Sequence, residues 1–192
     1  MTSTILVLAS ASPRRAELLR SAGIPFEVVV ADVDERQFAD EDAETYVRRL
    51  AREKAAKVAG LCPGRAVLGA DTAVVLDGDV LGKPCDTTDA AAMLSRLSGR
   101  SHRVLTGVCV IAPSGQVETA VAATVVEFRP LSQREIDQYV ASGEPMDKAG
   151  AYGIQAGARG FIARVEGDHD TVVGLPVALV QAMCRAGRIQ VS

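Results

Sequence analysis

Thr4-Ile-Leu-Val-Leu-Ala-Ser-Ala-Ser-Pro-Arg-Arg-Ala-Glu-Leu-Leu19 is the stretch of sequence from which the fold class follows. The apolar, β-branched run 4–9 predicts a strand, and Ser12 followed by Pro13 is typical of a helix N-cap and first helical position. The small residues between them predict a tight loop that joins the strand to the helix. Because strands that alternate with helices build α/β sheets, this N-terminal stretch indicates an α/β fold.

The rest of the chain continues the alternation of strands and helices. Strands are predicted over 26–30, 66–76, 80–81, 103–112, 117–128 and 161–165, and helices over 45–58, 86–97, 132–141 and 176–186. Asp77-Gly78 is typical of a two-residue hairpin turn. Glycines are dense between Ser142 and Gly160, which favours a loop that wraps a ligand closely. A length of 192 residues suits one domain, or two small lobes that share a core.

Composition excludes several classes of protein. Hydrophobic residues make up 48% of the chain, enough for a core without disulfide or metal staples. The formal net charge of −3 argues against a protein that coats DNA, RNA or an anionic membrane by bulk charge. The four cysteines form no C-x-x-C pair and are expected to be buried or incidental thiols in a reducing compartment. Since no signal peptide or membrane span is apparent, we expect a cytoplasmic protein.

The first candidate site is the loop that runs from Ser10 to Arg15. Backbone N–H groups at a helix N-terminus, together with the guanidinium groups of Arg14 and Arg15, suit phosphate oxygens. Cations at this end oppose the helix dipole, so they are unusual for a merely structural helix. A capped surface helix with solvated arginines is the alternative, and both interpretations stay open here.

The second candidate site is the polar pair Asp71-Thr72 inside the apolar stretch 66–76. A carboxylate at such a position must be desolvated, paired, metal-bound or placed at a strand end that faces a cleft. A bulge or edge residue that faces water is the alternative. Glu35, from an acidic run, and Asp71 could together supply the oxygen ligands that Mg²⁺ prefers. The sequence alone does not bring these two residues together.

The remaining candidates are weak when each is taken alone. Lys54 and Lys83 are two of only a few lysines, yet each fits an ordinary surface charge. The segment 78–84 resembles a P-loop only superficially, because it is one residue too short and ends in proline. His102 and His169 lie in no metal-binding cluster and no G-x-S-x-G motif accompanies them, so we expect them to be structural or exposed. Gln155, among glycines, fits a turn residue or a reader of a base edge.

Six segments, taken in their order along the chain, resemble one known family. They are Leu8-Ala-Ser-Ala-Ser-Pro-Arg-Arg15, Arg52-Glu-Lys-Ala55, Gly69-Ala-Asp-Thr72, Leu81-Gly-Lys-Pro84, Leu97-Ser-Gly99 and Glu144-Pro-Met-Asp-Lys-Ala-Gly-Ala-Tyr-Gly-Ile-Gln155. Together they resemble the Maf family of nucleoside triphosphate pyrophosphatases. The resemblance runs through nearly the whole chain, to Val173-Gly-Leu-Pro176. The last segment is similar to the branch that acts on dTTP and UTP, rather than the branch associated with 7-methyl-GTP.

The resemblance implies a fold like that of inosine triphosphate pyrophosphatases. This is an α/β fold in which a long bent mixed sheet and flanking helices form two lobes around a cleft. Residues 1–192 would then make up a single Maf-type catalytic domain.

The resemblance also implies a role for each candidate residue. Asp71 would be the proton acceptor that activates water, and base specificity would depend on Arg14, Thr72 and Gln155. Ser10, Arg15, Lys54 and Lys83 are expected around the polyphosphate, and Glu35 with Asp71 at a divalent metal cation, Mg²⁺ or Mn²⁺. Ala156 stands where related sequences usually place glycine, which bears on the loop that carries Gln155.

The implied activity is hydrolysis of dTTP and UTP to the monophosphate and pyrophosphate, with house-cleaning of modified pyrimidine nucleotides as a further use. Two alternatives stay open: the same chemistry on 7-methyl-GTP or another nucleotide, and a nucleotide-binding regulator of cell division. The expected partner is a nucleoside triphosphate, with neither nucleic acid nor membrane, since no RNP, HTH or basic-stripe signature is present. A homodimer is left open.

The side chain of Gln155 has a specific limitation as a base reader. Its amide can accept a hydrogen bond from N3–H and donate one to O4 of uracil or thymine. Turned over, the same amide would pair with cytosine as well. Discrimination between these bases therefore requires neighbours that fix the orientation of Gln155.

Overall fold

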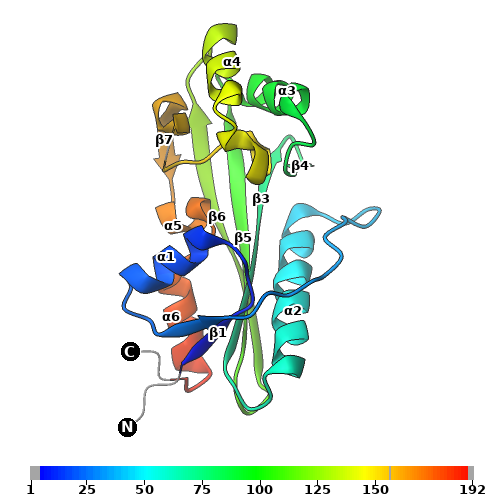
Figure 1. Cartoon of the computed structure of the whole chain (residues 1–192), viewed down its shortest axis with the longest axis vertical. Coiled ribbons are helices and arrows are strands. Elements are labelled where there is room, and N and C mark those ends of the chain that lie inside the picture. Colours follow the sequence, from blue (N-terminus) through cyan, green and yellow to red (C-terminus); the bar gives the residue numbers. More distant parts are fainter. Residues whose placement is uncertain (1–4, 156, 190–192) are drawn as a thin grey trace. The chain divides into compact units, whose positions relative to one another are not determined.

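The computed structural model describes residues 5–155 and 157–189, in which strands and helices alternate (Figure 1). The strands are β1 Leu6–Leu8, β2 Phe26–Val28, β3 Val67–Leu76, β4 Asp79–Leu81, β5 Ser101–Ile111, β6 Val117–Phe128 and β7 Ile162–Glu166. The α-helices are α1 Pro13–Ser21, α2 Ala43–Leu61, α3 Thr87–Leu97, α4 Gln133–Ala141, α5 His169–Val173 and α6 Val177–Ala186. Three short 3₁₀ helices are η1 Glu144–Asp147, η2 Ala149–Ala151 and η3 Gly157–Phe161. The predicted α/β class is confirmed.

The strands form one mixed sheet in the order β2-β1-β3-β5-β6-β7, and β4 pairs with β3. Strand β1 is parallel to both β2 and β3, whereas β4 is antiparallel to β3 and β7 is antiparallel to β6. Asp77 and Gly78 form the turn between β3 and β4 with φ of 55° and 94°. These left-handed conformations are what the predicted Asp-Gly hairpin requires. The mixed sheet with flanking helices is therefore present.

The chain forms two compact units. Unit 1 consists of Met1–Asp71, Thr106–Ala122 and Gly174–Ser192, and unit 2 consists of Thr72–Leu105 and Ala123–Val173. Strands β3, β5 and β6 each contribute residues to both units. The N-terminal strand and helix that indicate the fold class thus belong wholly to unit 1.

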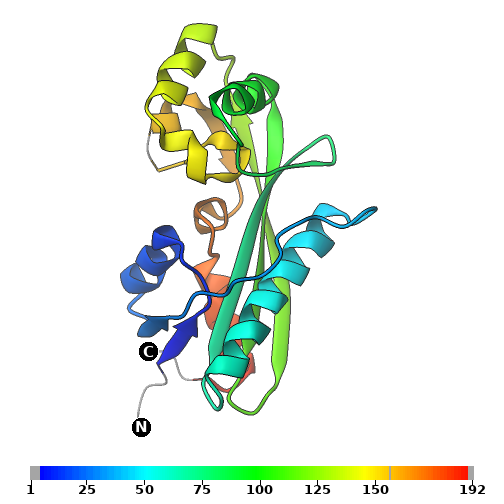
Figure 2. The same ribbon diagram turned by 45° about the vertical axis from the view of Figure 1, so that its right-hand side comes forward.

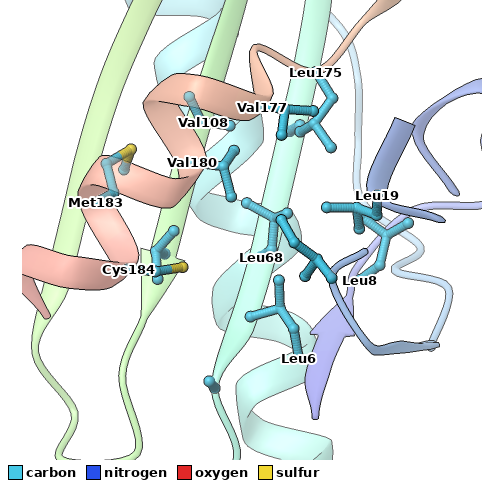
Figure 3. Packing of buried hydrophobic residues seen from close by; sticks show 14 of the residues in the cluster. Leu6, Leu8, Leu19, Leu68, Val108, Leu175, Val177, Val180, Met183 and Cys184 are labelled. Carbon is cyan, nitrogen blue, oxygen red and sulfur yellow. The ribbon is translucent and has the colours of Figure 1, made fainter. Parts of the chain in front are cut away.

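Helices cover both faces of the sheet in unit 1. Successive residues of a strand point to opposite faces. Leu6 and Leu8 accordingly join the cluster packed around α1 and α6, whereas Val7 and Ala9 pack with residues of α2. Figures 1 and 2 show α1 and α2 on opposite sides of β1. Figure 3 shows Leu6, Leu8 and Leu68 pointing towards the side chains of α1 and α6, so the helix that carries the candidate arginines is fixed by burial.

Helix α2 approaches the sheet most closely at two glycines. A Cβ added to Gly69 would lie 2.2 Å from the carbonyl oxygen of Ala51, and one added to Gly107 would lie 2.3 Å from that of Val47. No side chain fits at such distances, so glycine is required at both positions. Asp71 follows Gly69 by two residues on the same face of β3, and Lys54 follows Ala51 by one helical turn. The close approach therefore places Lys54 beside Asp71.

The core of unit 2 contains an aromatic cluster. The ring of Phe128 lies edge-on to His102 at 5.1 Å, to Tyr152 at 4.8 Å and to Phe161 at 6.1 Å between centroids. The ring of Tyr139 packs edge-on against Phe161 at 5.2 Å. Such edge-to-face pairs add specific geometry to apolar burial. They anchor the glycine-rich segment of the chain at residues on both sides of Gln155.

Free thiols and a buried histidine are further features of the described fold. All four cysteines are free thiols, and two of them, Cys109 and Cys184, are buried. Among the residues described, no helix combines the length and apolar character needed to cross a membrane. His102 is buried in the core, in agreement with the structural role expected for it.

Candidate active site

Asp71 forms a buried ion pair in the middle of β3. Asp71 is 8% exposed, and Lys54 of α2 is 7% exposed. The ammonium of Lys54 donates a hydrogen bond to Oδ1 of Asp71 over 2.6 Å. The interpretation of Asp71 as a bulge residue that faces water is therefore wrong. The ion pair with Lys54 of α2 offsets the cost of burying the Asp71 carboxylate inside an apolar strand.

Glu35 joins this pair from the connection between β2 and α2. Its Oε1 lies 2.7 Å from Nζ of Lys54, and its side chain is 50% exposed. The hydroxyl of Tyr46 in α2 donates to the backbone carbonyl of Glu35 over 2.8 Å, which holds the connection against the helix. One ammonium thus lies between two carboxylates that are distant in the sequence. We call Glu35, Lys54 and Asp71 the carboxylate–lysine cluster.

The environment of Asp71 changes its basicity. Burial raises the pKa of Asp71 above its ordinary value, while the charges of Lys54 and Arg15 act in the opposite direction and Glu35 adds to the rise. Desolvation penalises the ionised form of a carboxyl group. A carboxylate with a raised pKa is a better proton acceptor near neutral pH than an exposed aspartate. Burial beside Lys54 therefore makes Asp71 a candidate for a general base.

Arg15 lies inside the fold, at the start of α1. Its Nε donates to the backbone carbonyl of Gly174 over 2.9 Å, and its Nη1 donates to Oγ of Ser10 over 3.0 Å. Oγ of Ser10 also accepts from the backbone N–H of Ser12 over 3.2 Å, and Ser12 caps the helix. Burial lowers the pKa of Arg15, against the opposing charges of Asp71 and Glu35. Arg15 is therefore not a solvated surface arginine, whereas Arg14 next to it is only partly buried.

The predicted site residues divide between the two units. Ser10, Arg14, Arg15, Glu35, Lys54 and Asp71 belong to unit 1, and Thr72, Lys83 and Gln155 belong to unit 2. Within unit 1, the charges of Asp71 and Glu35 both act on Arg15. The loop from Ser10 to Arg15 and the carboxylate–lysine cluster therefore lie in one region. Within unit 2, Thr72 is partly buried on β3, Lys83 is exposed after β4, and Gln155 is exposed between η2 and η3. Ala156 lies outside the described residues.

Two contributors to the region around Asp71 and Arg15 were missed by the sequence reasoning. Tyr46 supports Glu35 through its hydroxyl, but in the sequence it appears only as one of several residues at helical spacing. Gly174 supports Arg15 through a carbonyl, at a φ of 124° that favours glycine. The segment Val173-Gly-Leu-Pro176, at the end of the family resemblance, is the one signal that could have drawn attention to it.

Glu35 and Asp71 are the residues that could hold a metal ion. Both carboxylates lie within hydrogen-bonding distance of the same Lys54 Nζ, so their oxygens are close to each other. Within 5–155 and 157–189, no group of three or more His, Cys, Asp or Glu side chains is arranged to hold a metal. Mg²⁺ is commonly held by one or two carboxylates with substrate phosphates and water. The pair therefore fits a cation that the substrate shares.

Known proteins resemble this chain in fold and in sequence. A crystal structure of a protein from Vibrio cholerae aligns with 14% identity and a TM-score of 0.50, over 96% of this chain and 98% of that one, which shows a shared fold. The dTTP/UTP pyrophosphatase of Symbiobacterium thermophilum is 55% identical over 90% of this chain and 88% of its own length. The dTTP/UTP pyrophosphatase of Myxococcus xanthus is 54% identical over 96% of this chain and 93% of its own length. Residues 5–186 match the family described as Maf-like protein, and the chain therefore belongs to the Maf family.

Proposed function

We propose that this protein is a nucleoside triphosphate pyrophosphatase that hydrolyses dTTP and UTP to the monophosphate and pyrophosphate. The observation that carries the proposal is the buried Asp71, with a raised pKa, bonded to Lys54 and close to Arg15. This arrangement supplies a base and fixed positive charge in one place. Relatives that are 54% and 55% identical over most of the chain carry the name dTTP/UTP pyrophosphatase, which supports the choice of nucleotides.

Asp71 would activate the attacking water. The water oxygen forms a bond to the α-phosphorus, the bond from that phosphorus to the α–β bridging oxygen breaks, and pyrophosphate leaves. Lys54 holds Oδ1 of Asp71, so Oδ2 is the oxygen we expect to accept the water proton. A general base of this kind contributes roughly 10² to 10⁴-fold to the rate.

Fixed cations would stabilise the charge on the phosphates. Phosphoryl and nucleotidyl transfer depend mainly on positioning and electrostatic stabilisation. Arg15 is held rigidly by Ser10 and the carbonyl of Gly174, so its charge does not need to reorganise during the reaction. Arg14 and Lys83 are proposed as further phosphate neighbours from the resemblance alone.

We propose that Glu35 and Asp71 hold a divalent cation, Mg²⁺ or Mn²⁺, together with the substrate phosphates. When bound, such a cation polarises the phosphate oxygens as a Lewis acid. Lys54, bonded to both carboxylates, keeps these two side chains close together before the substrate arrives.

Base selection is assigned to Gln155, with Arg14 and Thr72 as further contributors. The Gln155 amide matches N3–H and O4 of uracil and thymine, the donor and acceptor that dTTP and UTP share. A cytoplasmic location is proposed as well, since the four free cysteines suit a reducing compartment. A homodimer stays a prediction, which light scattering of the purified protein tests.

A nucleotide panel tests the proposed function. Purified protein is incubated with dTTP, UTP, CTP, GTP and 7-methyl-GTP, with Mg²⁺ or Mn²⁺, and pyrophosphate release is measured. We expect kcat/KM to be highest for dTTP and UTP, with one pyrophosphate for each monophosphate formed. Highest activity on 7-methyl-GTP would favour the same chemistry with the specificity of the other branch of the family. If no nucleotide released pyrophosphate, the nucleotide-binding regulator would be the favoured alternative.

A further inference from the structure

One pair of side chains holds the backbone on both sides of Gln155. The hydroxyl of Tyr139, near the end of α4, accepts a hydrogen bond from the N–H of Gly153 over 3.2 Å. Oε2 of Glu144, at the start of η1, accepts one from the N–H of Gly157 over 3.0 Å. These two amides lie two residues before and two residues after Gln155. The segment that carries the proposed base reader is therefore attached at both ends.

The two side chains are also bonded to each other. The Tyr139 hydroxyl has a single proton, which it donates to Oε1 of Glu144 over 2.9 Å while its oxygen accepts from Gly153. An ionised carboxylate only accepts, so Glu144 suits both the Tyr139 O–H and the Gly157 N–H. The bonds form a continuous chain from Gly153 through Tyr139 and Glu144 to Gly157. We call this pair of side chains the Tyr139–Glu144 clamp.

The backbone at Gly153 and Gly157 lies so close to neighbouring side chains that an added Cβ would have to displace one of them. A Cβ on Gly157 would lie 2.9 Å from Oε2 of Glu144 and 3.0 Å from Cε2 of Tyr139. A Cβ on Gly153 would lie 2.7 Å from Cε of Lys148 and 3.3 Å from Oε1 of Glu144. Part of the glycine density in this segment thus serves the clamp itself.

The clamp is built on a rigid base. The ring of Tyr139 is buried and packs edge-on against Phe161. Burial and the hydrogen bond to Glu144 raise the pKa of Tyr139, so the hydroxyl keeps the proton that it donates. The backbone carbonyl of Glu144 accepts from Nζ of Lys148 over 2.6 Å, which fixes the start of η1. A movement of Gly153 or Gly157 away from Tyr139 and Glu144 would break a hydrogen bond.

We propose that Tyr139 and Glu144 are positioning residues for base selection, which hold the backbone on both sides of Gln155 so that its side chain reaches the base from one fixed place. The proposal rests on the proposed function, in which Gln155 reads the pyrimidine. A hydrogen-bonding group discriminates between substrates only while it is held in the productive geometry. A loosened clamp lets Gln155 move away from N3–H and O4 of uracil, so activity on UTP falls relative to CTP while the chemistry at Asp71 stays in place.

Two substitutions test the clamp. Tyr139→Phe keeps the ring against Phe161 and removes the hydroxyl. Glu144→Gln keeps the shape of the side chain but offers one acceptor oxygen in place of two, so one of its two donors loses its partner. For each variant we expect the ratio of kcat/KM for UTP to that for CTP to fall by about tenfold, as the loss of one charge-assisted or buried hydrogen bond implies. The value of kcat for UTP should change much less than its KM.

Matched controls separate positioning from loss of stability. Tyr152→Phe also removes a buried hydroxyl in unit 2, the one bonded to Nε2 of His102 over 2.8 Å. Glu135→Gln also neutralises a glutamate in unit 2, one that belongs to the α4 capping box and pairs with Arg129. We expect both controls to lower the melting temperature and to keep the UTP to CTP ratio of the wild type.

Amide hydrogen exchange of the peptide that covers 150–160 provides a second measurement. Exchange should be faster in Tyr139→Phe and Glu144→Gln than in the two controls at equal global stability. Unchanged exchange and an unchanged UTP to CTP ratio, in a wild type that prefers UTP, would overturn the clamp while the proposed function stands. A wild type that hydrolyses neither nucleotide, or both equally, would overturn the proposed base selection and the clamp's role with it.

Discussion

At the scale of single residues, Lys54 joins the two carboxylates of the candidate site. Its ammonium bonds Asp71 and Glu35, two carboxylates that would otherwise repel each other at close range. Removal of one partner from a buried ion pair leaves an uncompensated charge. Lys54 therefore both stabilises unit 1 and limits how far burial raises the pKa of Asp71.

Substitution of Asp71 tests the assignment of the base. Asp71→Asn keeps an oxygen that accepts from Lys54, so the fold should persist, but an amide does not accept a proton from water. We expect pyrophosphate release to fall by roughly 10² to 10⁴-fold on every nucleotide of the panel. The matched control is Asp79→Asn, which removes an exposed carboxylate paired with Arg96. Full turnover by Asp71→Asn would show that another group is the base.

The buried side chain of His102 makes the stability of the protein depend on pH. Burial lowers the pKa of His102 from 6.5 to about 4, and among the described residues its Nδ1 has no hydrogen-bond partner. The unfolded chain therefore binds a proton at a higher pH than the folded chain, and stability is lost as pH falls from about 6.5 towards 4. Between pH 7 and pH 5 the loss from this group is roughly 2 kcal/mol.

Urea unfolding at the two pH values checks this expectation. In His102→Gln the titration is absent, so the difference in unfolding free energy between pH 7 and pH 5 should shrink by that amount. An equal pH dependence in wild type and variant would mean that other groups dominate the acid sensitivity.

Sequence reasoning identified some of these residues and not others, for physical reasons. Asp71 stands out because a carboxylate is costly inside an apolar strand. Lys54, Glu35 and Gln155 are only weak candidates without the family resemblance, because each alone fits a surface, loop or turn position. Tyr139 carries no such signal, and Glu144 opens a segment of the resemblance without an implied role of its own. The hydrogen bonds of both depend on how a helix and a loop meet in the folded chain.

At the scale of elements, the capping residues were more informative than the periodicity. Ser12 caps α1 as predicted, and Ser132 with Glu135 forms the capping box of α4. The periodic pattern predicted that α2 begins at residue 45, but the helix begins at Ala43. Asp42 is its N-cap and accepts a hydrogen bond from the N–H of Thr45 over 2.8 Å. Helix α5 and the three 3₁₀ helices lie where no helix was predicted, because such short elements contain too few residues to show a period.

The packing of α2 on β3 leads to a prediction at this scale. Gly69→Ala drives a Cβ to 2.2 Å from the carbonyl oxygen of Ala51, so helix and strand must separate. We expect a loss of at least about 2 kcal/mol in the free energy of unfolding. Because the separation also moves Lys54 away from Asp71, kcat should fall as well.

Gly60→Ala is the matched control, since Gly60 lies in α2 itself and a Cβ there meets nothing within 4 Å. It should stabilise the protein by about 0.5–1 kcal/mol, because alanine is the better helix former. Urea unfolding measures both variants. Equal stability of the two would contradict the close approach at Gly69.

At the scale of the whole molecule, the proposed base and the proposed base reader belong to different units. Asp71 ends the first stretch of unit 1, and Gln155 lies in unit 2. Gln155→Ala should therefore lower the preference for dTTP and UTP over CTP by about tenfold or more, while activity on CTP changes little. The nucleotide panel measures this, and a uniform loss over all nucleotides would mean that Gln155 serves the chemistry.

The architecture at this scale was predictable only in part. Alternation of strands and helices indicated α/β, and the resemblance implied the mixed sheet. Strand lengths and turn residues do not reveal which neighbours a strand pairs with, so the position of β1 between β2 and β3 required the structure. The division of β3 between two compact units, with its boundary after Asp71, has no local signal either.

The division into two units limits how the protein can be cut into separate parts. The chain passes between the units after Asp71, Leu105, Ala122 and Val173, and the first three of these points fall inside strands β3, β5 and β6. Neither unit is a continuous piece of sequence, so no single truncation isolates one of them. A chimera that borrows the base-reading unit of a relative must be spliced at all four points, three of them in hydrogen-bonded backbone where mismatched ends are poorly tolerated. New specificity in this scaffold is more accessible through substitutions around Gln155 than through exchange of segments.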